Sequence, residues 1–114
     1  IKPNFHQAGA LYDIVEPTSN VCNPAGEWNH VLLKINHLTN KGEVKLNGTK
    51  IVSFPLKGPT WDKLIENTKF RNIEDVNYDP LFNPNFGYFD TGKIGLQDHG
   101  DKVSYRNIKI REIK

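Results

Sequence analysis

The chain of 114 residues contains one cysteine, Cys22, and no methionine. A single cysteine cannot form an internal disulfide, and no Cys or His partner stands near it at metal-site spacing, so we interpret Cys22 as buried filler or an incidental residue. No segment approaches the roughly 18 apolar residues that a membrane span requires. The 15 Lys and Arg residues are scattered among 13 Asp and Glu residues, which argues against a nucleic-acid interface because no basic stripe forms.

Turn-forming residues are plentiful, with 9 Gly and 7 Pro, and 11% of the chain is aromatic. This mixture favours short strands joined by many turns, and the length suits a single domain, residues 1–114, with a modest core. The chain begins at Ile1 with neither an initiator Met nor a signal peptide. We therefore expect a processed, truncated or excised chain, and six or so strands suggest that N-terminal strands of the domain are missing.

Hydrophobic periodicity predicts antiparallel strands. A short strand is expected over residues 8–15, and a clearer one over residues 31–37 with alternate apolar residues on one face. Residues 43–54 read as a hairpin around Asn47-Gly48, because both central positions of a type I′ turn need positive φ. Two final strands, residues 92–99 and 103–113, flank a turn at Gly100-Asp101. The fold class expected from this pattern is an all-β antiparallel sandwich.

One helix is predicted, beginning at residues 59–62, with Thr60 as its cap. Its apolar face includes Trp61, and we interpret both Trp28 and Trp61 as core residues. The turn-rich stretch of residues 71–91 is unusually aromatic. Within it we expect Tyr78 and Tyr88 to border a cleft, and the Phe residues to cap the core: Phe82, Phe86 and Phe89.

The strand expected at residues 92–99 carries the most informative polar pattern. Alternation places Gln97 and His99 on one face, with Gly95 leaving space between polar side chains for a ligand. Tyr12 belongs to the same face if Leu11 packs inside, and a Tyr ring with amide and imidazole groups suits a sugar. The alternative is a plain turn in which Asp98 and Asp101 cap backbone amides.

Three segments resemble a known family. They are Gly9-Ala-Leu-Tyr-Asp13, Gly26-Glu-Trp-Asn-His30, and Leu96-Gln-Asp-His-Gly-Asp101 running into Tyr105-Arg-Asn-Ile-Lys-Ile-Arg111, with Leu46-Asn-Gly48 between them. In this order they resemble the C-terminal part of the bacterial 3-keto-disaccharide hydrolase domain. The resemblance implies a concanavalin-like lectin/glucanase jelly roll with one short rim helix. Lys45, where members often carry an aromatic residue, and a longer loop at residues 78–89 depart from the family pattern.

The resemblance implies cleavage of a glycosidic bond in a sugar with a ketone at carbon 3, by elimination and then hydration. Such proton abstraction needs a base near neutral pKa and a group that holds enolate charge. On this reading His99 is the base, and Asp98 or Asp101 orients it. Arg106 either stabilises the enolate or pairs with a neighbouring acid. Gln97 and Tyr12, with Asp101, bind substrate.

A divalent metal is an alternative electrophile. Its candidate ligands are His99, Asp13 and Glu27, although no spacing demands a metal. The cofactor therefore stays open, and carbohydrate is the expected partner.

Two rival functions remain open. The first is a non-catalytic carbohydrate-binding module on the same sandwich, because fold does not fix function. The second is a fragment that works only with a complementary N-terminal segment or another copy of the chain, which an exposed sheet edge would accept. The resemblance alone implies a periplasmic, extracellular or cell-surface location.

Overall fold

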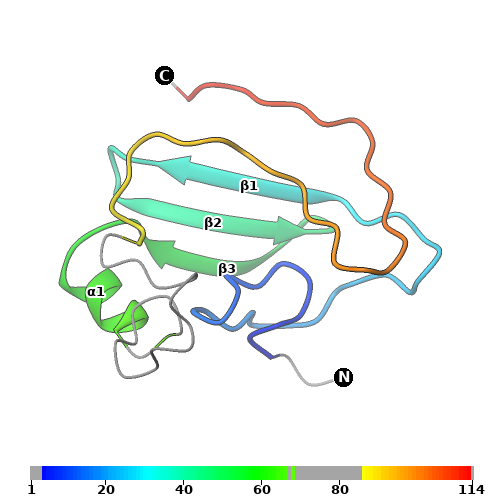
Figure 1. Ribbon diagram of the computed structural model, residues 1–114, viewed down its shortest axis with the longest axis horizontal. Coiled ribbons are helices and arrows are strands. Elements are labelled where there is room, and N and C mark those ends of the chain that lie inside the picture. The colour runs from blue at the N-terminus through cyan, green and yellow to red at the C-terminus, as the bar shows by residue number, and fades with distance from the viewer. Residues whose placement is uncertain (1–3, 67, 69–85, 114) are drawn as a thin grey trace.

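A computed structural model of the chain describes residues 4–66, 68 and 86–113 (Figure 1). Its regular elements are β1 (Val31–Asn36), β2 (Lys41–Leu46), β3 (Thr49–Pro55) and α1 (Pro59–Ile65). The three strands form one antiparallel sheet in the order β1-β2-β3. The strand predicted at residues 31–37 and the hairpin predicted at residues 43–54 are both confirmed.

The turn between β2 and β3 follows from its two residues. Asn47 and Gly48 both have positive φ, 51° and 85°, as a two-residue hairpin requires. The Asn47 side chain also accepts a hydrogen bond from the His30 backbone N–H at 2.9 Å and donates one to the Val21 carbonyl at 2.8 Å. One turn residue therefore sets the hairpin and anchors the loop that leads into β1.

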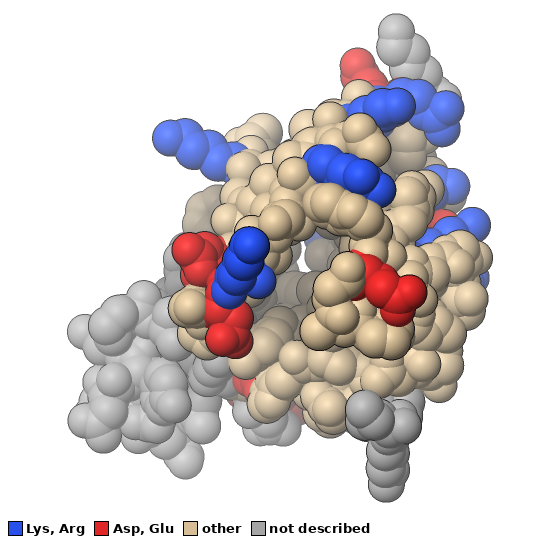
Figure 2. All heavy atoms as spheres, turned by 90° about the vertical axis from the view of Figure 1, so that its right-hand side faces the viewer, with Lys and Arg blue, Asp and Glu red and all other residues tan. Residues whose placement is uncertain are grey.

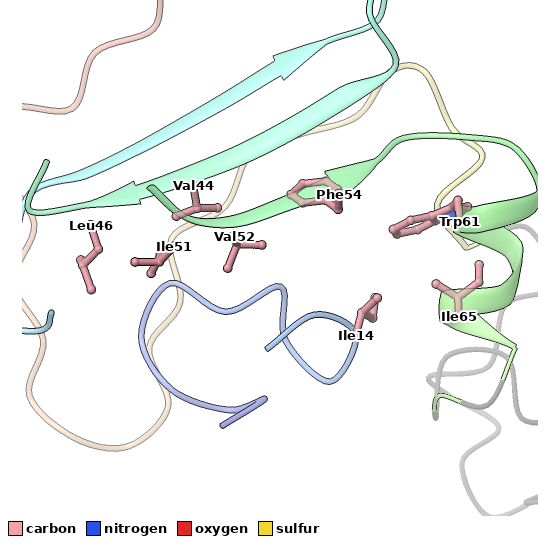
Figure 3. Close-up of a cluster of buried hydrophobic side chains, with 8 residues drawn as sticks. All are labelled: Ile14, Val44, Leu46, Ile51, Val52, Phe54, Trp61 and Ile65. Atoms are coloured by element: carbon pink, nitrogen blue, oxygen red, sulfur yellow. The ribbon is translucent and has the colours of Figure 1, made fainter. Parts of the chain in front are cut away.

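The core lies on one face of β2 and β3 (Figure 3). Ile14 reaches it from the N-terminal segment, and Trp61 and Ile65 reach it from α1. On the sheet, Gly42 lies opposite Phe54, and a side chain on Gly42 would overlap the Phe54 ring. The buried residues are Ile14, Val44, Leu46, Ile51, Val52, Phe54, Trp61 and Ile65.

β1 carries the same apolar pattern without the same cover. Val31 pairs with Leu46 and Leu33 with Val44, so these β1 side chains share the face of the sheet that is buried on β2. Yet Val31 is 59% exposed and Leu33 is 63% exposed. The layer formed by the N-terminal segment and α1 covers β2 and β3 and does not bury this edge strand.

Three predicted strands are absent from the described residues. Residues 8–15 form turns with a single bridge between Leu11 and Val15, because Gly9 and Asp13 have positive φ and bend the chain. Residues 92–99 and 103–113 are extended without strand pairing. A strand is completed by its neighbour's hydrogen bonds, and no described strand lies beside either segment in register.

The helix is confirmed, but its predicted cap is wrong. The N-cap is Gly58, no side chain caps the helix, and Thr60 lies within the first turn after Pro59. Proline fits this position because its missing N–H has no intrahelical partner there. Trp61 is buried as predicted.

One further prediction of burial is wrong. Trp28 is 48% exposed, because it lies in the loop before β1, outside the covered face of the sheet. Cys22 lies in the same loop and is exposed, which agrees with an incidental residue and not with buried filler. In the aromatic stretch, Phe86 packs against the core as expected, whereas Phe89 is exposed. Residues 71–85, with Tyr78 and Phe82, lie outside the described residues.

The β-rich class is confirmed, with three antiparallel strands and one short helix. The described residues contain one sheet, so the two-sheet sandwich and the jelly roll stay predictions. Within the described part of the chain, no helix has the length and apolar character needed to cross a membrane.

Candidate functional site

The predicted site begins at residues 97–101, where the C-terminal segment turns back. The Tyr105 hydroxyl donates a hydrogen bond to the Gln97 carbonyl at 2.7 Å, which ties the two arms of the segment together. Between them, the Gly100 N–H donates to Asp98 Oδ1 at 3.1 Å, and Gly100 has a φ of 99°. Asp98 therefore caps the turn, which is the plain role that the sequence left open for it.

His99 lies at this turn, and no described carboxylate pairs with it. Among the described residues, no hydrogen bond or ion pair joins His99 to Asp98 or Asp101. The Asp98 carboxylate already accepts the Gly100 N–H. The orienting role of Asp98 or Asp101 toward His99 stays a prediction, as does the substrate-binding role of Gln97.

Arg106 connects the C-terminal segment to the loop before β1. Its guanidinium lies 4.0 Å from the centre of the Trp28 ring, a cation–π contact. The Trp28 backbone is held in turn by the Asn23 side-chain amide, which donates to the Trp28 carbonyl at 2.9 Å. A guanidinium stacked on a ring keeps its in-plane N–H groups available, so Arg106 can still bind an oxyanion.

Tyr12 and Asp13 lie in a second group, around His6. His6 Nε2 lies 3.2 Å from Asp13 Oδ1, and the His6 and Tyr12 rings are 4.7 Å apart between centroids. Asp13 holds a left-handed conformation, with φ 65°, and its N–H donates to the Phe5 carbonyl. The carboxylate–imidazole arrangement expected at His99 is thus found at His6.

His6 was not among the candidate site residues predicted from the sequence. It is largely exposed, but it contacts two of the predicted site residues, Tyr12 and Asp13. The available signal was the short separation of His6 and Asp13 around Gly9, which permits a tight reversal of the chain. A strand over residues 8–15 would have carried Asp13 away from His6, so the wrong strand prediction concealed the pair.

The end of the molecule that holds the loop of residues 20–30 and the turn of residues 98–101 is hollowed (Figure 2). Acidic side chains lie on two sides of the opening, and Lys and Arg side chains lie around and above it. This surface offers both hydrogen-bond acceptors and donors around a concave centre. Such a mixture suits a polyhydroxylated ligand.

The predicted metal ligands lie apart from any cluster of further candidate ligands in the described structure. The Asp13 carboxylate pairs with His6. Among residues 4–66, 68 and 86–113, no three His, Cys, Asp or Glu side chains lie close enough together to hold a metal ion. The role of His99, Asp13 and Glu27 as metal ligands stays a prediction.

Comparison with known proteins identifies relatives over almost the whole chain. Residues 2–111 match the family model described as the 3-keto-alpha-glucoside-1,2-lyase-like domain. A protein of Bacteroides thetaiotaomicron named 3-keto-disaccharide hydrolase is 32% identical over 112 residues, which is 96% of this chain. The match spans 37% of that relative's length.

Proposed function

Because the chain belongs to the 3-keto-alpha-glucoside-1,2-lyase-like domain family, we propose that it takes part in cleaving glycosides that carry a ketone at carbon 3. The observation that carries this proposal is the family match over residues 2–111. The relative named 3-keto-disaccharide hydrolase supports the same substrate class. The match covers 37% of that relative's length, so the activity of the whole relative enters here only as a proposal.

The proposed reaction is elimination followed by hydration. The ketone at carbon 3 acidifies the hydrogen on carbon 2, and a base removes that proton. The electron pair left on carbon 2 forms a double bond to carbon 1, and the leaving sugar departs with the glycosidic oxygen and takes up a proton. Water then adds across the double bond, with the hydroxyl going to carbon 1 and the hydrogen to carbon 2, and this gives the free 3-keto sugar. This route avoids the two placed carboxylates of an ordinary glycosidase.

In this proposal His99 removes the proton and Arg106 holds the enolate charge. The His99 imidazole lies on an exposed turn where a substrate can reach it. Arg106 is positioned by Trp28 and keeps its in-plane donors. Gln97, Tyr12 and Asp101 would bind sugar hydroxyls, and Asp98 would support the turn that presents His99.

The test follows a 3-keto-glucoside and its unoxidised parent by NMR with the wild-type chain and with His99→Ala. We expect the wild-type chain to release product from the 3-keto-glucoside and none from its unoxidised parent. His99→Ala should lower the rate of release by about 100-fold to 10,000-fold. His6→Ala is the matched control, because His6 is the imidazole that already has a carboxylate partner. If His6→Ala lost activity and His99→Ala kept it, the catalytic base would be assigned to the His6–Asp13 pair and not to His99.

A non-catalytic carbohydrate-binding module is the second candidate function. The observation that favours it is the lack of a carboxylate partner for His99 among the described residues. On that view both sugars bind and neither is cleaved. Binding of the 3-keto-glucoside without turnover, at any pH between 5 and 9, would support the module and contradict the lyase chemistry.

We also propose that β1 receives a complementary segment. Val31 and Leu33 extend the apolar face of the sheet beyond its cover, while the opposite face of the same strands carries Lys34 beside Glu43. A free strand edge with one uncovered apolar face is suited to pairing with a further strand. Native mass spectrometry and a thermal melt test this: a cooperative melt of the lone monomer contradicts the need for a partner, and a dimer identifies another copy as the occupant.

A periplasmic, extracellular or cell-surface location is proposed on the family relationship alone. Cell fractionation with an antibody against the chain tests it directly. Recovery in the cytosolic fraction would contradict the proposal.

A further inference from the structure

Asn47, at the turn between β2 and β3, binds the loop before β1 at several points. Its Oδ1 accepts the His30 backbone N–H at 2.9 Å, and its own backbone N–H donates to the His30 carbonyl at 2.8 Å. The side-chain amide nitrogen donates to the Val21 carbonyl at 2.8 Å and to Asn29 Oδ1 at 2.9 Å. The amide oxygen and the amide nitrogen of Asn47 therefore both hold this loop.

Two further asparagines continue these contacts to Trp28. Asn29 Oδ1 also accepts the Asn23 backbone N–H at 2.7 Å, and the Asn23 side-chain amide donates to the Trp28 carbonyl at 2.9 Å. The Trp28 ring in turn carries the Arg106 guanidinium, 4.0 Å from its centre. A continuous series of contacts thus runs from the hairpin turn to Arg106.

The two ends of this series differ in how firmly they are packed. Next to the turn, Leu46 and Ile51 are each 1% exposed and belong to the core. Trp28, at the other end, is 48% exposed. Asn47 therefore connects an exposed aromatic ring to the buried part of the sheet, and such supporting contacts are what fix a functional group in place.

We propose that Asn47 is a positioning residue that sets the place of the Arg106 guanidinium through Trp28. This inference rests on the proposed function, in which Arg106 holds the enolate charge. A donor stabilises a developing charge best when it is already in place, and a displacement of about 1 Å can cost about 100-fold in rate. Asparagine suits the position because an amide both accepts and donates, whereas a carboxylate only accepts.

Asn47→Asp tests the series, because it replaces one NH₂ group by oxygen and keeps an Asp-Gly turn. The new carboxylate would face two acceptors, the Val21 carbonyl and Asn29 Oδ1, to which the amide donates in the wild type. If Asn29 turned its amide to donate to the carboxylate, the Asn23 N–H would lose its acceptor. In either arrangement the connection to Trp28 is broken.

The first readout is the NMR shift of the Arg106 side-chain protons, which lie over the Trp28 ring and are moved upfield by its ring current. Arg106→Gln assigns these signals, and we expect the upfield shift to be lost in Asn47→Asp. The second readout is the release of product from the 3-keto-glucoside. Here kcat should fall by about tenfold to 100-fold with KM little changed, because the charge held by Arg106 arises in the transition state.

Asn40→Asp is the matched control. Asn40 also has positive φ, 55°, and its side chain accepts from the Lys57 N–H at 2.9 Å and donates to the Lys57 carbonyl at 3.0 Å. It lies at the turn between β1 and β2, which is the opposite end of the sheet. The same chemical change there should leave the Arg106 shift and kcat unchanged. An unchanged shift in Asn47→Asp, or an equal loss in Asn40→Asp, would overturn the inference.

The NMR readout separates this inference from the proposed function. A lost Arg106 shift in Asn47→Asp, when the wild type does not cleave the sugar, supports the positioning of Arg106 and contradicts the lyase chemistry. Cleavage by the wild type with an unchanged shift in Asn47→Asp does the reverse. If a thermal melt shows that Asn47→Asp does not fold, Asn23→Ala removes the donor to the Trp28 carbonyl and leaves the hairpin untouched. It should also lose the upfield shift, and a wild-type shift in Asn23→Ala would contradict the series.

Discussion

The β2–β3 hairpin and the C-terminal segment have similarly apolar sequences and very different surroundings. Leu46 and Ile51 are each 1% exposed, whereas Ile94 and Ile110 are 79% and 78% exposed. The difference lies in what packs against each region, because the hairpin is covered by α1 and the N-terminal segment while the C-terminal segment runs extended (Figure 1). Apolar alternation therefore marks side chains suited to burial, and the neighbouring elements decide whether burial occurs.

The largest expected contrast comes from matched truncations in the two regions. Ile65→Ala removes a fully buried side chain and should lower the free energy of unfolding by about 2–5 kcal/mol. Ile110→Ala should change it by less than about 0.5 kcal/mol, because Ile110 is 78% exposed. Urea unfolding of both variants measures the contrast. An equal loss in Ile110→Ala would show that the C-terminal segment is buried by another chain or segment.

A pair of glycine substitutions sharpens the same comparison. Gly42→Ala places a methyl group against the Phe54 ring in the packed sheet and should cost about 1–3 kcal/mol. Gly95→Ala meets nothing within 4 Å in the open segment and should leave stability nearly unchanged. Thermal melts followed by circular dichroism separate the two. A destabilised Gly95→Ala would place an unseen neighbour beside residue 95.

The contact between Arg106 and Trp28 attaches the open region to the rest of the chain. Arg106→Gln removes this contact and should lower the local stability of the segment by about 0.5–1 kcal/mol, which is typical of an exposed cation–π contact. Faster amide hydrogen exchange over residues 103–109 is the expected readout. Arg111→Gln is the control, and equal exchange in both variants would show that the stacking does not hold the segment.

The smallest effect concerns the ion pair between Lys57, which follows β3, and Asp90. The hydrogen bond and charge of Lys57 lower the pKa of the Asp90 carboxyl, and His37 adds to this. A lowered folded-state pKa means that the contribution is present above the unfolded pKa of Asp90 and is lost as pH falls through the folded one. Carboxyl NMR titration of wild type and Lys57→Met should show the pKa rising in the variant, and an unchanged pKa would contradict the pairing.

Local signals were the reliable part of the sequence. Asn47-Gly48 requires positive φ at both positions, so the hairpin could be predicted from those two residues and their flanks. Local signals were not enough to predict whether residues 92–99 and 103–113 form strands, because a strand depends on hydrogen bonds from a distant neighbour. The misplaced helix cap has a smaller cause, since Gly58 and Pro59 together already begin the helix without a side-chain cap.

The candidate site divides in the same way. The turn role of Asp98 was predictable from the residues around it. The stacking of Arg106 on Trp28 joins segments far apart in the chain, and the His6–Asp13 pair depends on a reversal that alternation did not reveal. Among the described residues the buried Trp61 Nε1 has no hydrogen-bond partner, and the sequence could not show this because it does not reveal what packs against the indole edge.

By itself the sequence determined the β-rich class, the central hairpin, the helix, the resemblance to a family and the turn at residues 98–101. These follow from backbone preferences and side-chain periodicity, which act over a few residues. Only the tertiary structure decided which apolar faces are covered, which histidine has a carboxylate beside it, and which loop the Asn47 side chain holds. Those depend on contacts between segments distant in the chain, and no short-range preference specifies them.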